Sequence, residues 1–226
     1  KAVIVAEESF KAILARFDRN WTEQQLAWEL EREMRSRGAS GVSFPIIAAS
    51  GPASALPHYH PGPNRISDSP VLLIDWGAKL DGYVSDLTRM LWLDEDGPSA
   101  EFEAAHTAVN AAVEAAISVI RPGQSVRVVD QAARKELRAA GMEEAFLHSL
   151  GHGIGLEVHE GPRISSAGDD DSSPVLREGM IVTIEPGVYF ADQFGIRLEE
   201  DVLVTESGSK PLSTLPRGLV DLQAMM

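Results

Sequence analysis

The sequence predicts an α+β fold in which two similar halves share one β-sheet. Three observations support this prediction. A pair of helical patterns occurs twice at a constant offset, strand-like segments follow each pair, and acidic residues interrupt those segments in both halves. The chain has 226 residues, a length that fits one large domain or two small ones.

The first half opens with two helical patterns. Apolar residues recur at helical spacing from Phe10 to Phe17, which predicts the first helix. Thr22 is the predicted N-cap of the second helix, and Gln25 would complete a capping box with it. Apolar residues from Leu26 to Met34 continue one face of this helix, and Gly38 marks its end.

The second half repeats this pattern 103 residues later. An apolar stripe runs from Val113 to Ile120, and Ser125 is the next predicted N-cap. A further stripe runs from Val129 to Leu137 and stops before Gly141. Two helices, two caps and two stops at one offset indicate that the halves are related.

Each helical pair is followed by segments with the composition of β-strands. In the first half these are residues 42–47, 71–76 and 83–93, and in the second half residues 180–188 and 195–205. Both halves therefore run helix, helix and then antiparallel strands.

Composition excludes several classes of function. The chain has 34 acidic and 20 basic residues, a net charge of −14, and no cysteine. The absence of cysteine rules out disulfides, zinc fingers and a thiol nucleophile. With no export signal at the start of the chain, it also favours the cytoplasm. The negative charge argues against nucleic acid or an anionic membrane as a partner, and the apolar runs are too short to span a membrane.

Two acids interrupt the strands of the first half. Asp75 ends the apolar run 71–74, which predicts a buried strand, and Asp86 lies on the next strand-like segment. A two-residue turn at Leu80 and Asp81 would place the two carboxylates directly opposite each other. Like charges that face each other across a strand pair are destabilising.

The second half has the same feature in Glu185 and Glu199, which a loop centred near Asp192 would place opposite each other. For either pair alone, a surface position or an ion pair with Arg89 or Arg197 is an equal alternative. Two such pairs in related halves favour a metal site instead, because two divalent ions would neutralise four carboxylates.

Three histidines sharpen the metal hypothesis. His148, His152 and His159 lie within twelve positions, among glycines that allow close approach of the backbone. A lone histidine is more often a hydrogen-bonded structural residue than a metal ligand. The spacing matches neither a zincin motif nor a dinucleotide-binding loop.

At these residues the chain resembles the pita-bread metallopeptidases, the family of methionine aminopeptidase, Xaa-Pro aminopeptidase and prolidase. The resemblance implies two pseudo-symmetric halves, about 1–98 and 99–226, whose helices pack on a shared, mostly antiparallel curved sheet in one catalytic domain. The matching segments span nearly the whole chain in family order: Pro57-His58-Tyr59, Leu73 to Gly77 with Gly82 to Arg89, Gly151 to Gly155 with His159 to Pro162, and Thr183 to Gly187 with Arg197-Leu198-Glu199.

The resemblance implies a dinuclear metal site, with Asp86 and Glu199 as the bridging ligands. One histidine among four carboxylates is a hard, oxygen-rich ligand set that suits Mn²⁺, with Co²⁺ or Zn²⁺ as alternatives. A water held between the ions would be the nucleophile. The five implied ligands are Asp75, Asp86, His152, Glu185 and Glu199.

The resemblance also implies catalytic roles. Glu185 would be the general base, and His58 and His159 would bind the substrate and stabilise the tetrahedral intermediate. His58 has the alternative of being an ordinary loop histidine, and His60 receives no role.

Two further residues favour the proline-specific branch, which cleaves an N-terminal Xaa-Pro bond. His148 and Arg197 resemble substrate-binding residues there, although His148 has the alternative of orienting a metal ligand from behind. The resemblance leaves methionine aminopeptidase as the alternative activity. A non-catalytic scaffold or a creatinase-like enzyme ranks lower, because no ligand is lost.

The chain departs from the family pattern at Trp76 and at Asn20-Trp21, neither of which is an implied ligand. The N-terminal lobe of the proline-specific relatives is expected to be absent. The expected partner is a short peptide, and a homodimer is compatible with the resemblance.

Overall fold

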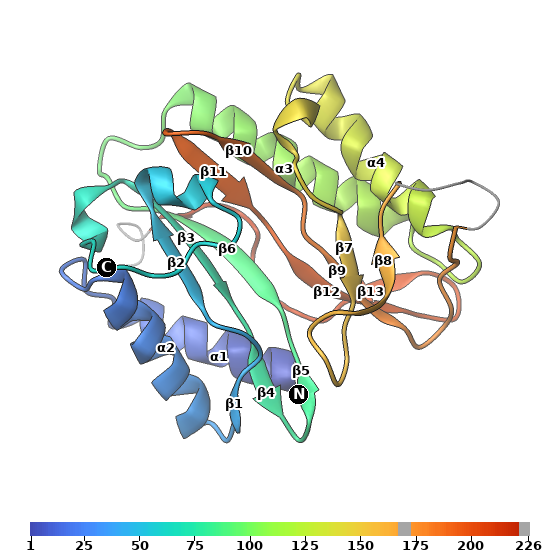
Figure 1. Ribbon diagram of the computed structural model, residues 1–226, viewed down its shortest axis with the longest axis horizontal. Helices are drawn as coiled ribbons and strands as arrows, with labels where there is room; N and C mark the ends of the chain where they lie inside the picture. The colour runs from blue at the N-terminus through green and yellow to red at the C-terminus, as the bar shows by residue number, and fades with distance from the viewer. Residues whose placement is uncertain (167–172, 222–226) are drawn as a thin grey trace.

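The computed structural model describes residues 1–166 and 173–221 and confirms the α+β class (Figure 1). The described α-helices are α1 (Ala2–Leu14), α2 (Glu23–Ser36), α3 (Ala100–Val119) and α4 (Val126–Ala139). The strands of the first half are β1 (Gly41–Val42), β2 (Ile47–Ser50), β3 (Val71–Trp76), β4 (Ala78–Leu80), β5 (Tyr83–Val84) and β6 (Leu87–Trp92). Those of the second half are β7 (Gly151–Gly153), β8 (Glu160–Ile164), β9 (Ile181–Ile184), β10 (Gly187–Phe190), β11 (Phe194–Arg197), β12 (Glu200–Val204), β13 (Ser209–Pro211) and β14 (Val220–Asp221).

The helix ends follow the predicted caps. Thr22 and Gln25 form the capping box of α2, with the Gln25 amide donating to the Thr22 hydroxyl at 3.2 Å. Ser125 caps α4, and both ends of α4 lie 103 residues beyond those of α2. The first helix was placed too late, because α1 ends at Leu14 and Phe17 lies beyond it.

The strands lie between the two helical pairs, with α1 and α2 below them in Figure 1 and α3 and α4 above. One sheet has the order β14-β6-β3-β2 and another the order β13-β12-β9-β7-β8. Smaller ladders join β10 to β11 and β1-β4-β5. Every described pair is antiparallel except β14 with β6. Strand β11 packs against β3 and β6, so the strands of the two halves meet near the middle of the molecule.

Strand β3 is buried on both faces. Val71 and Leu73 join the core that contains α3 and α4, whereas Leu72 and Trp76 join the core that contains α1 and α2. This packing explains Trp76, which departs from the family pattern: its ring stacks on a phenylalanine of α1 at 4.3 Å between ring centroids. Asp75 follows Val71 and Leu73 at every second position of β3, so its side chain points to the same face of the strand as theirs. That face is the one on which the two halves meet.

Candidate metal centre

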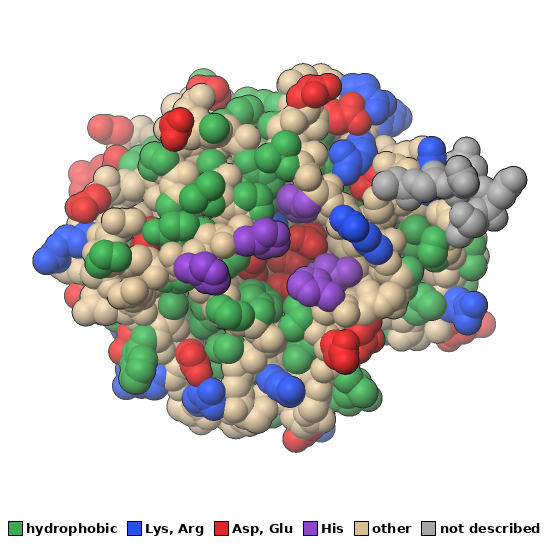
Figure 2. Space-filling model, viewed as in Figure 1, with side chains coloured by type: hydrophobic (Ala, Val, Ile, Leu, Met, Phe, Trp, Pro, Cys, Tyr) green, Lys and Arg blue, Asp and Glu red, His purple; other side chains and the backbone are tan. Residues whose placement is uncertain are grey.

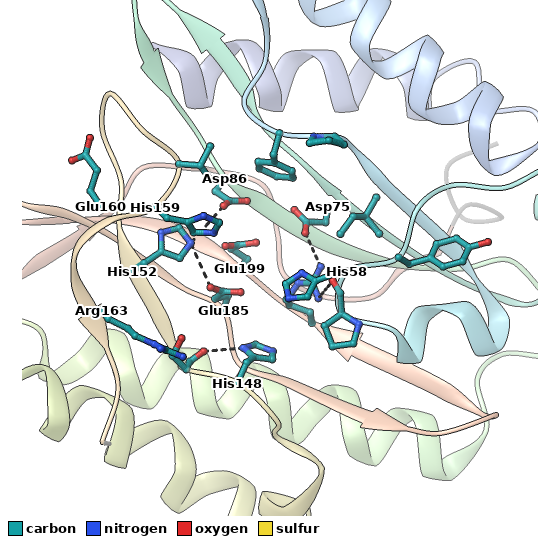
Figure 3. Close-up of a pocket in the computed structure, with 18 of the residues that line it drawn as sticks. His58, Asp75, Asp86, His148, His152, His159, Glu160, Arg163, Glu185 and Glu199 are labelled. Atoms are coloured by element: carbon teal, nitrogen blue, oxygen red, sulfur yellow. Dashed lines mark hydrogen bonds and ion pairs between the residues drawn. The ribbon is translucent and has the colours of Figure 1, made fainter. Parts of the chain in front are cut away.

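A cavity of about 550 Å³ opens on the face where the two halves meet. Figure 2 shows histidine side chains around a hollow with acidic side chains at its bottom. All nine residues that the sequence singled out line this cavity, and Figure 3 labels all of them except Arg197: His58, Asp75, Asp86, His148, His152, His159, Glu185, Arg197 and Glu199.

The first pair of acids is not paired as predicted. Asp75 lies opposite Thr88 in the β3–β6 ladder, and Asp86 lies just before β6, where the ladder is interrupted. The expected turn at Leu80 and Asp81 was wrong by one position. The turn is formed by Asp81 and Gly82, whose φ angles of 52° and 87° are those of a type I′ hairpin.

The register of the second pair is confirmed. Gly187 pairs with Arg197 on one side of the break in the hairpin, and Ile184 pairs with Glu200 on the other. Glu185 and Glu199 lie between these two ladders at the same register. Their backbone groups therefore leave the regular ladder, and the Glu199 amide donates instead to the Thr88 carbonyl at 3.3 Å. This bond joins the second half to the first.

His152 is held in β7 by its glycine neighbours. A Cβ atom at Gly151 would lie 2.0 Å from the Thr183 carbonyl oxygen, so only glycine lets β7 pack this closely. The His152 Nδ1 atom is 2.9 Å from the carbonyl of Gly153 and must donate to it. Its Nε2 lone pair therefore faces the acids, 3.5 Å from Glu185 and 3.8 Å from Asp86. Burial lowers the pKa of His152 to about 4, which leaves the imidazole neutral.

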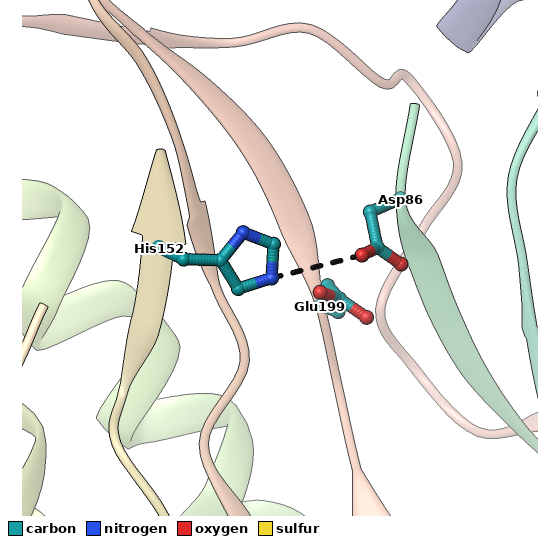
Figure 4. A group of neighbouring side chains, drawn as sticks. All are labelled: Asp86, His152 and Glu199. Carbon is teal, nitrogen blue, oxygen red and sulfur yellow. Dashed lines mark ion pairs between the residues drawn. The ribbon is translucent and has the colours of Figure 1, made fainter. Parts of the chain in front are cut away.

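The ligand atoms of Asp86, His152 and Glu199 all lie within 4.8 Å of one another (Figure 4). Burial raises the pKa of Asp86 well above its usual value, and the charge of Glu199 raises it further. Burial, followed by the charge of Asp75, raises the pKa of Glu199 to about 7. Burial and Glu199 also raise the pKa of Glu185 well above the usual range. The charge of Arg197 opposes these shifts at Glu185 and Glu199 but does not cancel them, so negative charge exceeds positive charge at this site.

Of the four carboxylates, only Asp75 forms, within the described part of the chain, the ion pair with an arginine that the sequence offered as an alternative. Arg197 donates to Asp75 Oδ2 at 2.6 Å, but Asp75 Oδ1 is buried without a hydrogen-bond partner among the described residues. Arg89 pairs instead with Glu200 at 2.6 Å. One guanidinium therefore faces four carboxylates. An unpartnered carboxylate oxygen, excess negative charge and a neutral imidazole fit a site for divalent cations.

Arg197 also anchors a chain of hydrogen bonds that the sequence did not predict. Its Nη1 donates to the Tyr189 hydroxyl at 2.9 Å, and that hydroxyl lies 2.8 Å from His148 Nε2. His148 Nδ1 faces the Ser149 carbonyl at 2.8 Å and must donate to it, so Nε2 accepts the Tyr189 proton. Both nitrogens of His148 are thus engaged by the protein, as expected for a residue that orients its neighbours.

Two further polar residues were missed, although strand alternation pointed to both. Thr88 follows Asp86 by two positions, and its hydroxyl donates to Glu199 at 2.6 Å. Asp201 follows Glu199 by two positions and accepts a hydrogen bond from the Asp86 amide at 3.1 Å. Both residues are buried, and their hydrogen bonds help to fix the positions of Glu199 and Asp86.

The other histidines that line the cavity are exposed. His159 is exposed, and its ring lies edge to face against His152 at 4.5 Å. His58 is exposed on the loop after β2. His60 and Arg163 line the same cavity, although the sequence suggested no role for either.

Comparison with known proteins identifies the family. Residues 1–206 match metallopeptidase family M24, and the chain therefore belongs to this family. It is 36% identical to an Xaa-Pro dipeptidase of Pyrococcus furiosus over 97% of this chain and 62% of the relative. It is also 36% identical to an uncharacterized peptidase of Bacillus subtilis over 98% of this chain and 61% of that protein.

Solved structures confirm the pita-bread fold. The chain matches an X-Pro aminopeptidase of Thermotoga maritima with a TM-score of 0.91 and 40% identity, over 97% of this chain and 61% of the other. It matches the prolidase of Pyrococcus furiosus with a TM-score of 0.89 and 36% identity, over 96% and 62% of the two chains. The chain thus spans about three fifths of the length of these relatives. Within the described residues, no helix is long and apolar enough to cross a membrane.

Proposed function

We propose that this chain is the catalytic part of a dinuclear metal-dependent peptidase that hydrolyses the N-terminal Xaa-Pro bond of short peptides. The observation that carries the proposal is the convergence of four carboxylates and one neutral imidazole in one cavity, where Arg197 is paired with Asp75. Similarity to proteins named Xaa-Pro dipeptidase and X-Pro aminopeptidase supports the proline-specific activity over methionine aminopeptidase. We place this activity in the cytoplasm and propose a homodimer as its assembly.

The proposed ligands have the chemistry that hard divalent cations require. When bound, two such ions, Mn²⁺ first and Co²⁺ or Zn²⁺ as alternatives, would polarise the scissile carbonyl and activate water for attack. The ligand atoms of Asp86 and Glu199 lie within 4.8 Å of each other and of His152, and the resemblance implies that these two carboxylates would be shared by the ions. The proposed ligands are Asp75, Asp86, His152, Glu185 and Glu199.

The residues of the chain supply the remaining chemistry. Glu185 would take the proton that the attacking water releases and pass it to the proline nitrogen, which has no hydrogen of its own in the peptide bond and leaves as an amine. His58 and His159 line the open side of the cavity, where they would donate hydrogen bonds to the substrate carbonyl oxygen. His148 and Arg197 would shape the substrate-binding wall by holding Tyr189 and Asp75 in place.

The first experiment measures metal content before activity. The protein is equilibrated with Mn²⁺, desalted and analysed for bound metal, and then assayed with Ala-Pro-Ala and Met-Ala-Ser peptides. We expect about two ions per chain and cleavage of the proline peptide alone. Asp86→Ala should lose metal and activity, whereas Asp96→Ala, at an exposed loop position, should keep both. A chain that binds no Mn²⁺, Co²⁺ or Zn²⁺ would refute the proposal.

A further inference from the structure

The orientation of His58 is not explained by its own contacts. The side chain is exposed, and its ring has no hydrogen bond within the described residues. Its position in the cavity (Figure 3) must therefore follow from the backbone on either side of it.

Both neighbours of His58 are anchored. The carbonyl of Pro57 accepts a hydrogen bond from Arg197 Nη1 at 3.5 Å. On the other side, the Tyr59 hydroxyl donates to Glu23 Oε2 at 2.7 Å. The first anchor is long and comes from the site itself. The second is short and comes from the start of α2, on the far side of the loop.

Glu23 is the centre of an unusual set of hydrogen bonds. Its side chain is fully buried, and its carboxylate accepts five hydrogen bonds from described residues. Oε1 accepts from the Ser50 amide at 2.9 Å and the Ser50 hydroxyl at 2.6 Å. Oε2 accepts from Tyr59, from the Gly62 amide at 2.9 Å and from the Asn64 side chain at 3.4 Å. These groups bracket the whole segment 50–64.

The backbone of α2 reinforces the same attachment. The Glu23 amide donates to the Asn64 carbonyl at 3.0 Å, and the Gln24 amide donates to the Gly62 carbonyl at 3.2 Å. No lysine, arginine or histidine in the described chain forms an ion pair with Glu23. Its two carboxylate oxygens instead face five hydrogen-bond donors, and the residue lies in the first turn of α2.

We propose that Glu23 is a positioning residue that holds segment 50–64 so that His58 points into the cavity. The inference rests on the proposed function only in that His58 acts on the peptide there. Burial and the neighbouring Glu23 carboxylate raise the pKa of Tyr59 to about 12, which keeps its hydroxyl a donor.

A glutamine cannot replace this carboxylate. Its single carbonyl oxygen can face either the Ser50 amide or the Gly62 amide, and its NH₂ group must then face the other. Both of these are fixed backbone donors that cannot turn to accept a hydrogen bond. Glu23→Gln therefore keeps the size of the side chain but leaves one buried amide opposed by a donor.

The first test does not depend on activity. Hydrogen exchange is measured by mass spectrometry on Mn²⁺-equilibrated wild-type protein and Glu23→Gln. Glu31→Gln is the matched control, because Glu31 lies on the same helix but pairs with Arg35 near the surface. We expect faster exchange in residues 51–64 of Glu23→Gln only, with metal content unchanged. Equal exchange in that segment would overturn the proposal.

The second test asks whether Glu23 acts through His58. Removing one buried hydrogen-bond arrangement should lower kcat/KM of Glu23→Gln by about tenfold. His58→Ala should change the same kinetic parameter, and adding Glu23→Gln to His58→Ala should have less than about a twofold further effect. An equal loss with and without His58 would show that Glu23 acts elsewhere and would refute the proposal.

Two further considerations distinguish failure of this proposal from failure of the variant to fold and from failure of the proposed function. If Glu23→Gln does not fold, Tyr59→Phe removes the hydrogen bond that joins Glu23 to the neighbour of His58, and this variant is tested in the same way. If the wild-type protein cleaves no Xaa-Pro peptide, the proposed function fails, while the exchange experiment still decides whether Glu23 holds the loop.

Discussion

Thr88→Val is the sharpest test of the metal centre, because it removes one hydroxyl and conserves the shape of the side chain. The Thr88 hydroxyl donates to Glu199 Oε2 at 2.6 Å and accepts from Arg197 Nε at 3.2 Å. Thr88 is fully buried, so no water can take over these contacts. A hydrogen bond to a charged group contributes about 1.5–3 kcal/mol.

This hydrogen bond favours the ionised form of Glu199, which is the form that binds metal. Burial already raises the pKa of Glu199 to about 7, and the loss of the Thr88 donor should raise it further. At about 1.4 kcal/mol per tenfold change, Mn²⁺ affinity at pH 7 should fall by about tenfold to a hundredfold.

The affinity is measured by calorimetry or by competition with a chelator at pH 6, 7 and 8. The deficit should be largest at the lowest pH, where protons compete best with the metal. Thr88→Ser retains the hydroxyl and should bind Mn²⁺ nearly as wild type does. Thr107→Val, at an exposed position on α3, controls for the exchange of threonine for valine. Wild-type affinity and pH dependence in Thr88→Val would refute the reasoning.

Three further predictions concern stability. In the folded, metal-free protein the raised pKa values of Asp86, Glu185 and Glu199 should keep protons on these groups at a pH where the unfolded chain has released them. His152 does not affect this trend above the ordinary histidine pKa of 6.5, because its imidazole is then neutral in both states. The free energy of unfolding should therefore fall between pH 7 and pH 9. Thermal unfolding in the presence of a chelator measures this change, and added Mn²⁺ should abolish it. A stability that rises with pH in the absence of metal would contradict the prediction. Although burial acts to raise it, hydrogen bonds from Lys11 and Thr214 lower the pKa of Glu7 to about 2, so Glu7→Gln should lose about 1–2 kcal/mol at pH 7. Urea unfolding should show that deficit shrinking as the pH falls from 4.5 towards 2, and an equal deficit throughout would count against the assignment. Gly151→Ala places a Cβ atom 2.0 Å from a backbone oxygen of β9 and should cost about 1–3 kcal/mol, whereas Gly208→Ala meets nothing within 4 Å; equal unfolding midpoints would contradict the packing argument.

The helix boundaries illustrate what can be predicted locally. The N-cap residues and stops lie within a few residues of the helix ends that they define, so α2 and α4 could be placed from Thr22 and Ser125. The turn at Asp81 and Gly82 was also readable, because Asp-Gly is a strong hairpin signal, and its use would have corrected the β3–β6 register. By contrast, the symmetric loop around Asp192 gave the correct register directly.

The partners of the charged residues were less predictable. The sequence offered Arg89 and Arg197 as equal partners for the acids, and nothing local distinguishes them. Only the packed strands place Arg197 against Asp75 and turn Arg89 away to Glu200. The bonds that link Tyr189 to His148 likewise join residues about 40 positions apart.

Residue patterns in the sequence predicted the helical pairs, their repetition and the excess of buried acid, and with the family resemblance they indicated nine of the residues that line the cavity. These features depend on local spacing and residue chemistry, which a linear pattern records. The tertiary structure alone decided which guanidinium faces which carboxylate, how Thr88 and Asp201 support the ligands, and how Glu23 holds the His58 loop. Those contacts form only when distant segments are packed together, because hydrogen-bond geometry requires a precision in distance and direction that sequence spacing does not contain.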